Sequence, residues 1–420
     1  MMLSLQPPPP APVLHILAHL QAAGHEAWLV GGAVRDRVLG RSGGDWDVAT
    51  SAQPTEVVEL FPKVVATGLQ HGTVTVVEAG EAVEVTTFRI EGTYTDGRRP
   101  DAVSFTRSLE EDLARRDFTV NAMAWDPHSG RFADPFGGRH DLERRLIRAV
   151  GAPLDRFTED GLRALRAVRF AAVLGFAIEP ATQHAIARTL GTFRQVSAER
   201  VRVELEKILA SPRAGWAVGL LRDTGLLGAC LPEVDALPEA DLARVVRALA
   251  ACAALTAGQA PGEIPLRFAI LLHAIQGDPD AVLRRLRFAN DVRRPITALL
   301  RLQGEHPHPA TDAEVRALVA RVTPGLLDDW LRLRSACEGP GPWQALAARI
   351  DAIGARQGPH TPGELALDGR EVMALTGLAP SRRIGRVQQW LLEQVWQDPT
   401  LNTQAALAAR LPQALAAVPE

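Results

Sequence analysis

Cysteine is scarce in this chain of 420 residues, which contains only Cys230, Cys252 and Cys337. Their odd number, their wide separation and the lack of a CxxC pair exclude a disulfide framework and indicate no zinc site. No apolar run reaches the length of a membrane span, and the N-terminal stretch MMLSLQPPPPAP lacks the charged and apolar regions of a signal peptide. We therefore expect a soluble, cytoplasmic protein without a membrane partner.

The chain also lacks a charge surplus, with a net charge of −3, and nearly lacks lysine, which occurs only at positions 63 and 207. Arginine makes bidentate contacts with phosphate, but the replacement of lysine runs through the whole chain, so a compositional bias is the simpler explanation. The net charge gives no overall sign of a polyanionic partner. With 46% hydrophobic residues, the chain can fill the cores of two to four domains.

Short β-rich runs separated by turns occupy residues 26–140, and residues 73–88 predict a hairpin around an Ala-Gly-Glu turn. From about residue 141, Leu, Ala and Val recur at helical spacing almost to the end, interrupted by Gly- and Pro-rich stretches. We expect an α+β fold in which a small mixed α/β head precedes an all-helical remainder. The Pro run at residues 7–10 is interpreted as a disordered N-terminal tip.

Two aspartates follow a glycine turn in the stretch LVGGAVRDRVLGRSGGDWDVATSA, residues 29–52. An extended segment points Asp45 and Asp47 to the same side, and two carboxylates so close favour a divalent cation, with Mg²⁺ as the natural candidate. A lone DxD is more often a turn or a helix cap. Glu84 would add the third carboxylate of a two-metal phosphoryl-transfer site, although by itself it would be a solvated strand residue.

The pair Gly31-Gly32 ends a predicted strand and opens a helix, where backbone N–H groups favour a phosphate, and Arg35 lies one turn in. Such a turn often needs glycine only for its backbone angles. The DxD motif that follows within 13 residues is what favours a site for a triphosphate and a metal. Arg116 and Asp117, in EEDLARRDFTVNAMAWD, could contact phosphate or ribose. They could equally form a surface charge cluster capped by Asp117.

The stretch RFTEDGLRALRAVRFAAVLGF, residues 156–176, predicts a helix on which Asp160 and Arg163 are neighbours. The simpler interpretation is an ordinary helix surface, with Glu159 paired to Arg163 and with Thr158 or Asp160 as the N-terminal cap. The other interpretation is base recognition. A carboxylate acceptor beside a guanidinium donor matches the edges of cytosine and adenine, and it leaves groups unpaired with guanine or uracil.

Taken in order, several long motifs resemble those of the class II tRNA nucleotidyltransferases, the CCA-adding enzyme family that shares its head domain with bacterial poly(A) polymerases. The match covers essentially the full length and includes LVGGAVRD, GDWDVATSA, HGTVTVV, EVTTFR, YTDGRRPDAVSF, SLEEDLARRDFTVNAMAWD, DPFGGRHDL, RFTEDGLRALRAVRF, ERVRVELEKIL and TPGELALDGREVM. The resemblance implies template-independent addition of CCA to the 3′ end of tRNA from CTP and ATP, with release of pyrophosphate.

The resemblance also implies a role for each motif. Asp45, Asp47 and Glu84 would be the catalytic carboxylates, and Asp45 and Asp47 would bind two Mg²⁺ ions. The glycine turn would hold the triphosphate, the RRD motif the ribose and the EDxxR motif the incoming base. The implied nucleotide-binding residues are Gly31, Gly32, Arg35, Arg116, Asp117, Asn121, Asp160, Arg163, Arg166 and Arg169, the last two as phosphate or structural contacts.

The expected organisation follows from these motifs and from the change of character near residue 141. It comprises an N-terminal segment 1–25, a catalytic head 26–140, a base-recognising neck 141–210, a helical body 211–330 and a helical tail 331–420. The body and tail would hold the acceptor and T arms of tRNA through shape and backbone contacts. No obligate protein partner is expected.

Other activities share parts of this pattern. An A-adding specialist would carry the same motifs, whereas a CC-only enzyme is disfavoured because the loop RIEGTYTDGRRPDAVSF is full length. A poly(A) polymerase is disfavoured because TGLQHGTVTVV resembles the CCA-adding branch, and a noncatalytic RNA-binding module because the carboxylates are intact. His140-Asp141, the only adjacent His-Asp pair, lies inside the hinge-like motif DPFGGRHDL, so we expect no phosphohydrolase activity.

Overall fold

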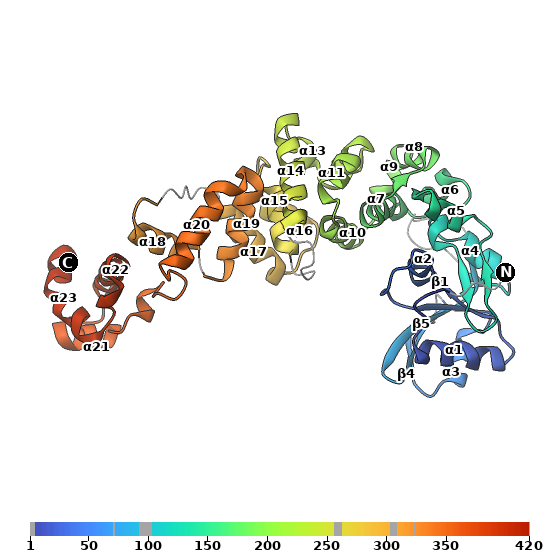
Figure 1. Cartoon of the computed structure of the whole chain (residues 1–420), viewed down its shortest axis with the longest axis horizontal. Helices are drawn as coiled ribbons and strands as arrows, with labels where there is room; N and C mark the ends of the chain where they lie inside the picture. The colour runs from blue at the N-terminus through green and yellow to red at the C-terminus, as the bar shows by residue number, and fades with distance from the viewer. Residues whose placement is uncertain are drawn as a thin grey trace. The chain divides into compact units, whose positions relative to one another are not determined.

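The computed structural model of the chain describes residues 5–69, 72–91, 103–255, 263–302, 309–322 and 324–419. The chain divides into two compact units, coloured from blue to red along the sequence in Figure 1. Unit 1 comprises Met1–Leu237 and Arg284–Arg287, and unit 2 comprises Pro238–Leu283 and Phe288–Glu420. The loop RIEGTYTDGRRPDAVSF, on which the choice against CC-only addition depends, lies mostly outside the described residues.

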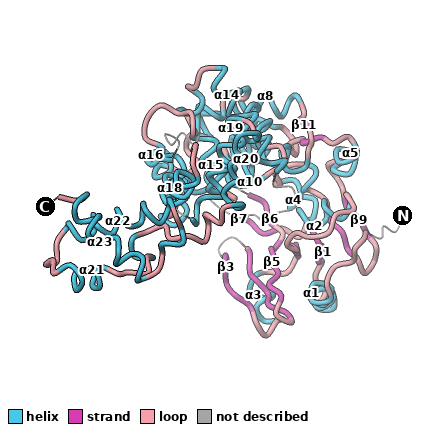
Figure 2. The backbone as a smooth tube through the Cα atoms, turned by 60° about the vertical axis from the view of Figure 1, so that its left-hand side comes forward, coloured by secondary structure: helices cyan, strands magenta, loops and turns pink. Residues whose placement is uncertain are grey.

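A seven-stranded sheet, with strand order β3-β4-β5-β2-β1-β8-β9, is the frame of unit 1 (Figure 2). Its strands are β1 (Ala27–Val30), β2 (Asp47–Thr50), β3 (Val64–Gly68), β4 (Thr73–Glu78), β5 (Glu81–Thr87), β8 (Ala124–Asp126) and β9 (Arg131–Ala133). Only β2 and β5 run parallel, and every other neighbouring pair is antiparallel. The expected hairpin over residues 73–88 is confirmed, because β4 and β5 meet at Ala79-Gly80, where both residues have positive φ.

Short helices and a small ribbon surround this sheet. They are α1 (Ala11–Ala22), α2 (Gly32–Val38), α3 (Pro54–Leu60), α4 (Leu109–Ala114), η2 (Thr119–Asn121), α5 (Gly138–Glu143) and the antiparallel pair β6 (Arg89–Glu91) and β7 (Val103–Phe105). The helices α1 and α3 pack against each other and against β4. The side chains of Trp28, Phe88 and Leu113 belong to one buried cluster, which joins β1 and α4 in a common core.

The expectation of a disordered N-terminal tip is wrong for residues 5–10. Leu5 is buried, and the carbonyl of Pro7 accepts a hydrogen bond from Arg37 Nε at 2.9 Å. Pro10 then stands at the N-cap of α1, where its fixed φ suits the start of a helix. The segment is ordered because Arg37 on the neighbouring helix α2 donates a hydrogen bond to the carbonyl of Pro7.

The rest of unit 1 is helical apart from the short parallel pair β10 (Leu146–Ile147) and β11 (Ala177–Ile178). Its helices are α6 (Pro153–Glu159), α7 (Leu162–Leu174), α8 (Pro180–Arg188), α9 (Leu190–Phe193), α10 (Ala198–Ala210), α11 (Ala214–Asp223), α12 (Leu226–Cys230) and α13 (Pro232–Asp235). The helix α7, nearly all of whose apolar side chains are buried, packs against both α10 and α11.

The expectation of one helix over residues 156–176 is wrong at its beginning. The helix α6 ends at Glu159, and α7 begins at Leu162. Asp160 has an extended backbone between them, with φ −138° and ψ 105°. A Cβ added to Gly161 would lie 2.7 Å from the backbone N of Phe193, so glycine is the residue that lets α7 start against α9. Asp160 therefore precedes α7 instead of lying on it.

Unit 2 contains only helices among its described residues. They are α14 (Glu239–Leu255), α15 (Ile264–Leu272), α16 (Pro279–Arg285, whose last two residues fall in unit 1), α17 (Asn290–Arg301), α18 (Asp312–Val322), η4 (Pro324–Leu326), α19 (Leu327–Glu338), α20 (Pro340–Ala352), η5 (Pro362–Glu364), α21 (Gly369–Thr376), α22 (Arg382–Gln397), η6 (Pro399–Leu401) and α23 (Gln404–Ala417). A buried cluster that includes Leu391 and Leu407 holds α21, α22 and α23 together. In the described part of the chain, no helix is long and apolar enough to cross a membrane. The α+β prediction is confirmed.

Candidate active site

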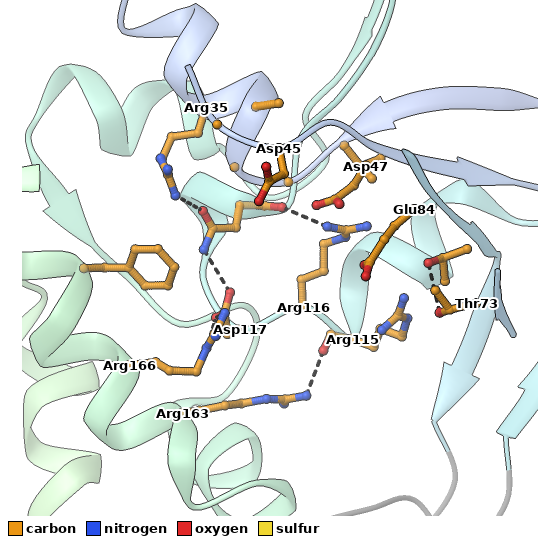
Figure 3. Close-up of a pocket in the computed structure, with 18 of the residues that line it drawn as sticks. Arg35, Asp45, Asp47, Thr73, Glu84, Arg115, Arg116, Asp117, Arg163 and Arg166 are labelled. Atoms are coloured by element: carbon orange, nitrogen blue, oxygen red, sulfur yellow. Dashed lines mark hydrogen bonds and ion pairs between the residues drawn. The ribbon is translucent and has the colours of Figure 1, made fainter. Parts of the chain in front are cut away.

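A cavity of about 640 Å³ opens in unit 1 and gathers residues that lie far apart in the sequence, from Val30 to Arg200 (Figure 3). Its lining includes every site residue that the sequence motifs indicated. These are Gly31, Gly32, Arg35, Asp45, Asp47, Glu84, Arg116, Asp117, Asn121, Asp160, Arg163, Arg166 and Arg169. The fold thus brings the glycine turn, the carboxylates and the arginine-bearing helix α7 to one place.

Three carboxylates meet at the edge of this cavity because of the sheet register. The parallel strands β2 and β5 pair Asp47 directly with Glu84, and Asp45 stands two residues before Asp47. Burial raises the pKa of Asp47 to about 6, the charge of Arg116 opposes this rise, and the charges of Glu84 and Asp45 add to it. The site therefore carries a local excess of negative charge that a cation would relieve.

The donor set fits a hard divalent cation. Carboxylate oxygens are the ligands that Mg²⁺ prefers, and Mg²⁺ commonly uses one or two protein carboxylates while water and phosphate oxygens complete its shell. Within the described residues, no group of three His, Cys, Asp or Glu side chains is arranged to hold a metal by itself. Asp45 and Asp47 therefore fit an ion that would take its remaining ligands from water and phosphate oxygens.

Gly31 passes close to the carboxylate pair at the start of α2. It has φ +73°, and an added Cβ would lie 3.3 Å from both Asp47 Oδ2 and Arg116 Nη1. A side chain here would thus be strained and crowded at once. Glycine at this position lets the backbone of the turn approach the same space as the carboxylates.

A chain of hydrogen bonds connects Arg35 to α7 across the floor of the cavity (Figure 3). Arg35 Nη1 donates to Asn121 Oδ1 at 2.8 Å, and Asn121 Nδ2 donates to Asp117 Oδ1 at 3.1 Å. Arg166 Nε and Nη2 donate to Asp117 Oδ2 at 2.8 and 2.6 Å. Burial alone would raise the pKa of Asp117, but the charge of Arg166 and the hydrogen bonds from Asn121 and Arg166 outweigh burial and hold it at about 2. Asp117 is therefore an ionised acceptor at neutral pH.

Arg115 and Arg116 share a buried acid. The carboxylate of Asp112 has no exposed surface and pairs with Arg115 Nη2 at 2.8 Å and Arg116 Nη2 at 3.3 Å. Burial favours the neutral acid, but both guanidinium charges outweigh it, so the pKa of Asp112 is lowered. Arg116 Nε is buried without a hydrogen-bond partner among the described residues, which leaves a donor that a ligand oxygen could satisfy.

Asp160 and Arg163 both line the cavity, but each is held by a different partner. Asp160 accepts two hydrogen bonds from Arg200, at 3.2 and 2.7 Å, and its Oδ1 also accepts from the Leu162 backbone N–H at 3.0 Å. Arg163 donates to Glu159 Oε2 at 2.7 Å. The pairing of Glu159 with Arg163, part of the simpler interpretation from sequence, is confirmed. Asp160 is not the N-cap of α7, which is Gly161, although its carboxylate accepts from the first N–H of that helix.

Arg163 also ties α7 to the head. Its Nη2 donates to the carbonyl of Arg115 at 3.0 Å, and Arg156 Nη1 donates to the carbonyl of Ala114 at 3.2 Å. Two arginines thus bind the C-terminal end of α4. Arg163 and the RRD motif consequently belong to one hydrogen-bonded assembly.

The sequence motifs did not indicate Arg200, Glu204 or Phe170, which also shape the site. Glu204, only 3% exposed, forms ion pairs with Arg169 Nε at 2.5 Å and with Arg166 Nη1 at 3.7 Å. The Cζ atoms of Arg169 and Arg166 lie 3.8 and 5.3 Å from the centre of the Phe170 ring. Arg200 and Glu204 are four residues apart on α10 and so share a helical face, which is the signal that ERVRVELEKIL contains.

Comparison with known proteins shows similarity through both units. The family model described as "Poly A polymerase head domain" matches residues 27–148, and "Probable RNA and SrmB- binding site of polymerase A" matches residues 175–237. A CCA-adding enzyme of Geobacillus stearothermophilus is 41% identical over 377 residues, 88% of each chain. One from Lactiplantibacillus plantarum is 38% identical over 402 residues, 93% of each chain.

A solved structure extends this similarity to the fold. The crystal structure of the Bacillus stearothermophilus CCA-adding enzyme in complex with CTP superposes with a TM-score of 0.79 at 37% sequence identity. The superposition covers 96% of each chain. The shared architecture therefore reaches from the sheet of unit 1 to the last helices of unit 2.

Proposed function

Because this chain belongs to the family of CCA-adding enzymes, we propose that it adds CCA to the 3′ end of tRNA with its own cavity in unit 1 as the active site. It is a nucleotidyltransferase that uses CTP and ATP, and its family implies a requirement for metal. The observation that carries the site assignment is the parallel register of β2 and β5, which sets Asp47 opposite Glu84 beside the Gly31 turn.

The triphosphate and the ribose bind at the head side of the cavity. The backbone N–H groups of the Gly31-Gly32 turn and the guanidinium of Arg35 receive the phosphates. Asp117, which is ionised at neutral pH, accepts a hydrogen bond from a ribose hydroxyl, and Arg116 holds the same sugar. The phosphate end of the site therefore offers hydrogen-bond donors and positive charge, whereas Asp117 offers an acceptor to the sugar.

The base is read at the neck side by Asp160 and Arg163. The carboxylate accepts from the exocyclic amino group of cytosine or adenine, and the guanidinium donates to the adjacent ring nitrogen. Guanine and uracil present the reverse order, so each would leave buried groups unpaired. Arg166 and Arg169 act mainly through other side chains, since Asp117 and Glu204 already engage them.

The reaction joins the tRNA 3′-oxygen to the α-phosphorus and breaks the bond from that phosphorus to the oxygen bridging to the β-phosphate. Two Mg²⁺ ions on Asp45 and Asp47 would supply Lewis-acid activation and charge neutralisation. Glu84 is the carboxylate that we assign to accept the proton of the attacking hydroxyl. Pyrophosphate leaves towards the glycine turn and Arg35.

We assign catalysis to the head (26–140), base recognition to the neck (141–210) and tRNA binding to the body (211–330) and tail (331–420). The acceptor and T arms of tRNA are the expected ligands of the helical remainder, recognised through shape and backbone. Since CTP, ATP and tRNA are used in the cytoplasm, we assign the enzyme to that compartment. No protein partner is needed for the reaction.

The test is incorporation of labelled CTP and ATP, separately and together, into tRNAs that end before C74 or after C75 in standard tRNA numbering. Addition of C, C and then A to the shorter tRNA is the expected result. Addition of A alone, and only to the CC-ended tRNA, would make the enzyme an A-adding specialist. Long A tails on unrelated RNA would make it a poly(A) polymerase. Asp45→Ala should abolish incorporation, and full activity in that variant would overturn the site assignment.

A further inference from the structure

Arg37 is a buried arginine on α2 that the reaction described above does not use. Its residue is 7% exposed, and it does not line the active-site cavity. No carboxylate among the described residues pairs with its guanidinium, although Arg35 on the same helix pairs with Asp36. A buried cation without an acid partner is costly unless other groups satisfy it. Its partners therefore indicate what the residue does.

Three backbone carbonyls receive the hydrogen bonds of Arg37. Its Nε donates to Pro7 O at 2.9 Å, and its Nη1 donates to Arg41 O at 2.9 Å and Gly43 O at 3.4 Å. The acceptors at residues 41 and 43 lie in the loop between α2 and β2, and Pro7 lies in the N-terminal segment. One side chain on α2 thus joins the N-terminal segment to the α2–β2 loop.

The guanidinium also stacks on Trp46. Its Cζ lies 4.7 Å from the centre of the Trp46 ring, within the range of a cation–π contact. Trp46 is 8% exposed and stands between Asp45 and Asp47. Trp46 joins Asp45 to Asp47 in the chain, so a fixed Trp46 ring restricts the backbone that carries both carboxylates.

The loop that delivers Asp45 needs such a contact. Residues 40–45 are exposed and contain no helix or strand, and Gly40, Gly43 and Gly44 have φ values of +68°, +103° and +89°. Glycine at positive φ loses more conformational entropy on ordering than other residues do. Without a brace, the position of Asp45 relative to Asp47 would vary.

We propose that Arg37 is a positioning residue that braces the α2–β2 loop and so fixes the separation of the metal-binding carboxylates Asp45 and Asp47. The N-terminal segment around Pro7 is part of the same brace, because its carbonyl accepts the Nε–H of the guanidinium while the loop carbonyls accept from Nη1. This inference rests on the proposed metal-binding role of Asp45 and Asp47. It assigns Arg37 no contact with nucleotide, metal or tRNA.

The test compares full-length Arg37→Met and Arg37→Lys with wild type. Two quantities are measured: the affinity for Mn²⁺ in the presence of a non-hydrolysable CTP analogue, by electron paramagnetic resonance, and the Mg²⁺ concentration that gives half-maximal CTP incorporation. Loss of a group hydrogen-bonded to a metal ligand weakens binding or activity about 10- to 100-fold. Because Arg37 acts through the loop backbone and Trp46, we expect an effect at the low end of this range, about tenfold weaker Mn²⁺ binding in Arg37→Met. Arg37→Lys should be intermediate, because it keeps a cation near Trp46 but loses the guanidinium fork. The KM for tRNA should not change.

Arg41→Met is the matched control, since it removes an exposed arginine side chain from the same loop and leaves its carbonyl in place. Wild-type metal affinity in both Arg37 variants would overturn the inference, as would a fall in kcat with no change in metal dependence. If Arg37→Met does not fold, Arg37→Lys decides, together with hydrogen exchange of residues 39–46, which should be faster than in wild type. Asp45→Asn separates the two proposals, because retained Mn²⁺ binding there would refute the metal site itself.

Discussion

The carboxylate of Asp47 lowers the free energy of unfolding of the metal-free protein at neutral pH. Burial and two neighbouring carboxylates raise its pKa from 3.8 to about 6, in spite of Arg116. In the metal-free protein between about pH 4 and pH 6, the folded state keeps a proton that the unfolded state has released. The free energy of unfolding therefore falls as the pH rises through this window and is constant above it.

Asp47→Asn should remove this fall in the free energy of unfolding, because asparagine does not titrate. We expect the metal-free variant to have a free energy of unfolding about 1–3 kcal/mol higher than wild type at pH 7, from about two pKa units at 1.4 kcal/mol each less solvent screening. The difference should vanish near pH 4, while nucleotidyl transfer is lost. Urea unfolding with chelator at both pH values measures it. The exposed Glu81→Gln on β5 should follow the wild-type curve, and a less stable Asp47→Asn at pH 7 would contradict the prediction.

Arg200 should control which base is accepted. Its guanidinium holds both oxygens of Asp160. Arg200→Met therefore leaves this carboxylate without the contact that orients it towards the exocyclic amino group of the base. We expect the ratio of kcat/KM for CTP over UTP to fall about tenfold, since about 1.4 kcal/mol of discrimination is within the value of one charge-assisted hydrogen bond. Arg202→Met is the control on the same helix, where Arg202 pairs with Glu206. Equal loss with CTP and UTP would indicate a purely structural role.

At the scale of secondary structure, the short link between α6 and α7 decides where Asp160 and Arg163, the proposed base-reading residues, stand. Gly161 permits the start of α7 to approach the backbone of Phe193. Gly161 has an ordinary helical φ of −57°, so what requires glycine is space and not backbone conformation. Asp160 lies one residue before this contact and depends on it.

Gly161→Ala should therefore destabilise the protein and weaken CTP binding. The added Cβ would lie 2.7 Å from backbone atoms that cannot move as a side chain does, and overpacking of this kind costs about 1–3 kcal/mol. We expect a lower midpoint of thermal unfolding and a raised KM for CTP. Gly191→Ala on α9, where nothing lies within 4 Å of the added Cβ, is the control. Equal stability of the two variants would contradict this account.

At the scale of the whole molecule, the active-site cavity is built entirely from residues of unit 1, whereas unit 2 has its own buried cores. Nucleotide binding and tRNA binding should thus respond differently to damage in unit 2. We propose that tRNA binding depends on the helical body and tail, so damage there should affect tRNA binding and not nucleotide binding.

Leu391→Ala tests this separation. Leu391 is fully buried in the cluster that holds α21, α22 and α23, and loss of such a side chain costs about 2–5 kcal/mol. We expect unit 2 to unfold earlier, the KM for tRNA to rise and the affinity for CTP, measured by calorimetry, to stay within twofold of wild type. Reduced CTP affinity would show that the two functions are coupled. Leu375→Ala on α21, which changes an exposed side chain, serves as the control for stability.

Local pattern in the sequence was enough to predict much of this protein. The hairpin of β4 and β5, the change from mixed structure to helices, and the motif residues of the cavity all depend on short-range periodicity, on turn chemistry or on motif resemblance. The expected helix over residues 156–176 and the disordered tip failed because each depended on a contact distant in sequence. Phe193 crowds Gly161, and Arg37 reaches Pro7.

What the sequence by itself determined is the set of chemical groups: the three carboxylates, the glycines at the turn, the arginines on α7 and the helices thereafter. The tertiary structure alone decided their partners. Strand register pairs Asp47 with Glu84, and the hydrogen bond from Arg200 to Asp160 joins residues forty positions apart. Propensity and motif spacing act over a few residues, whereas pKa shifts, ion pairs and braces such as Arg37 arise from burial and proximity, which exist only once the chain is folded.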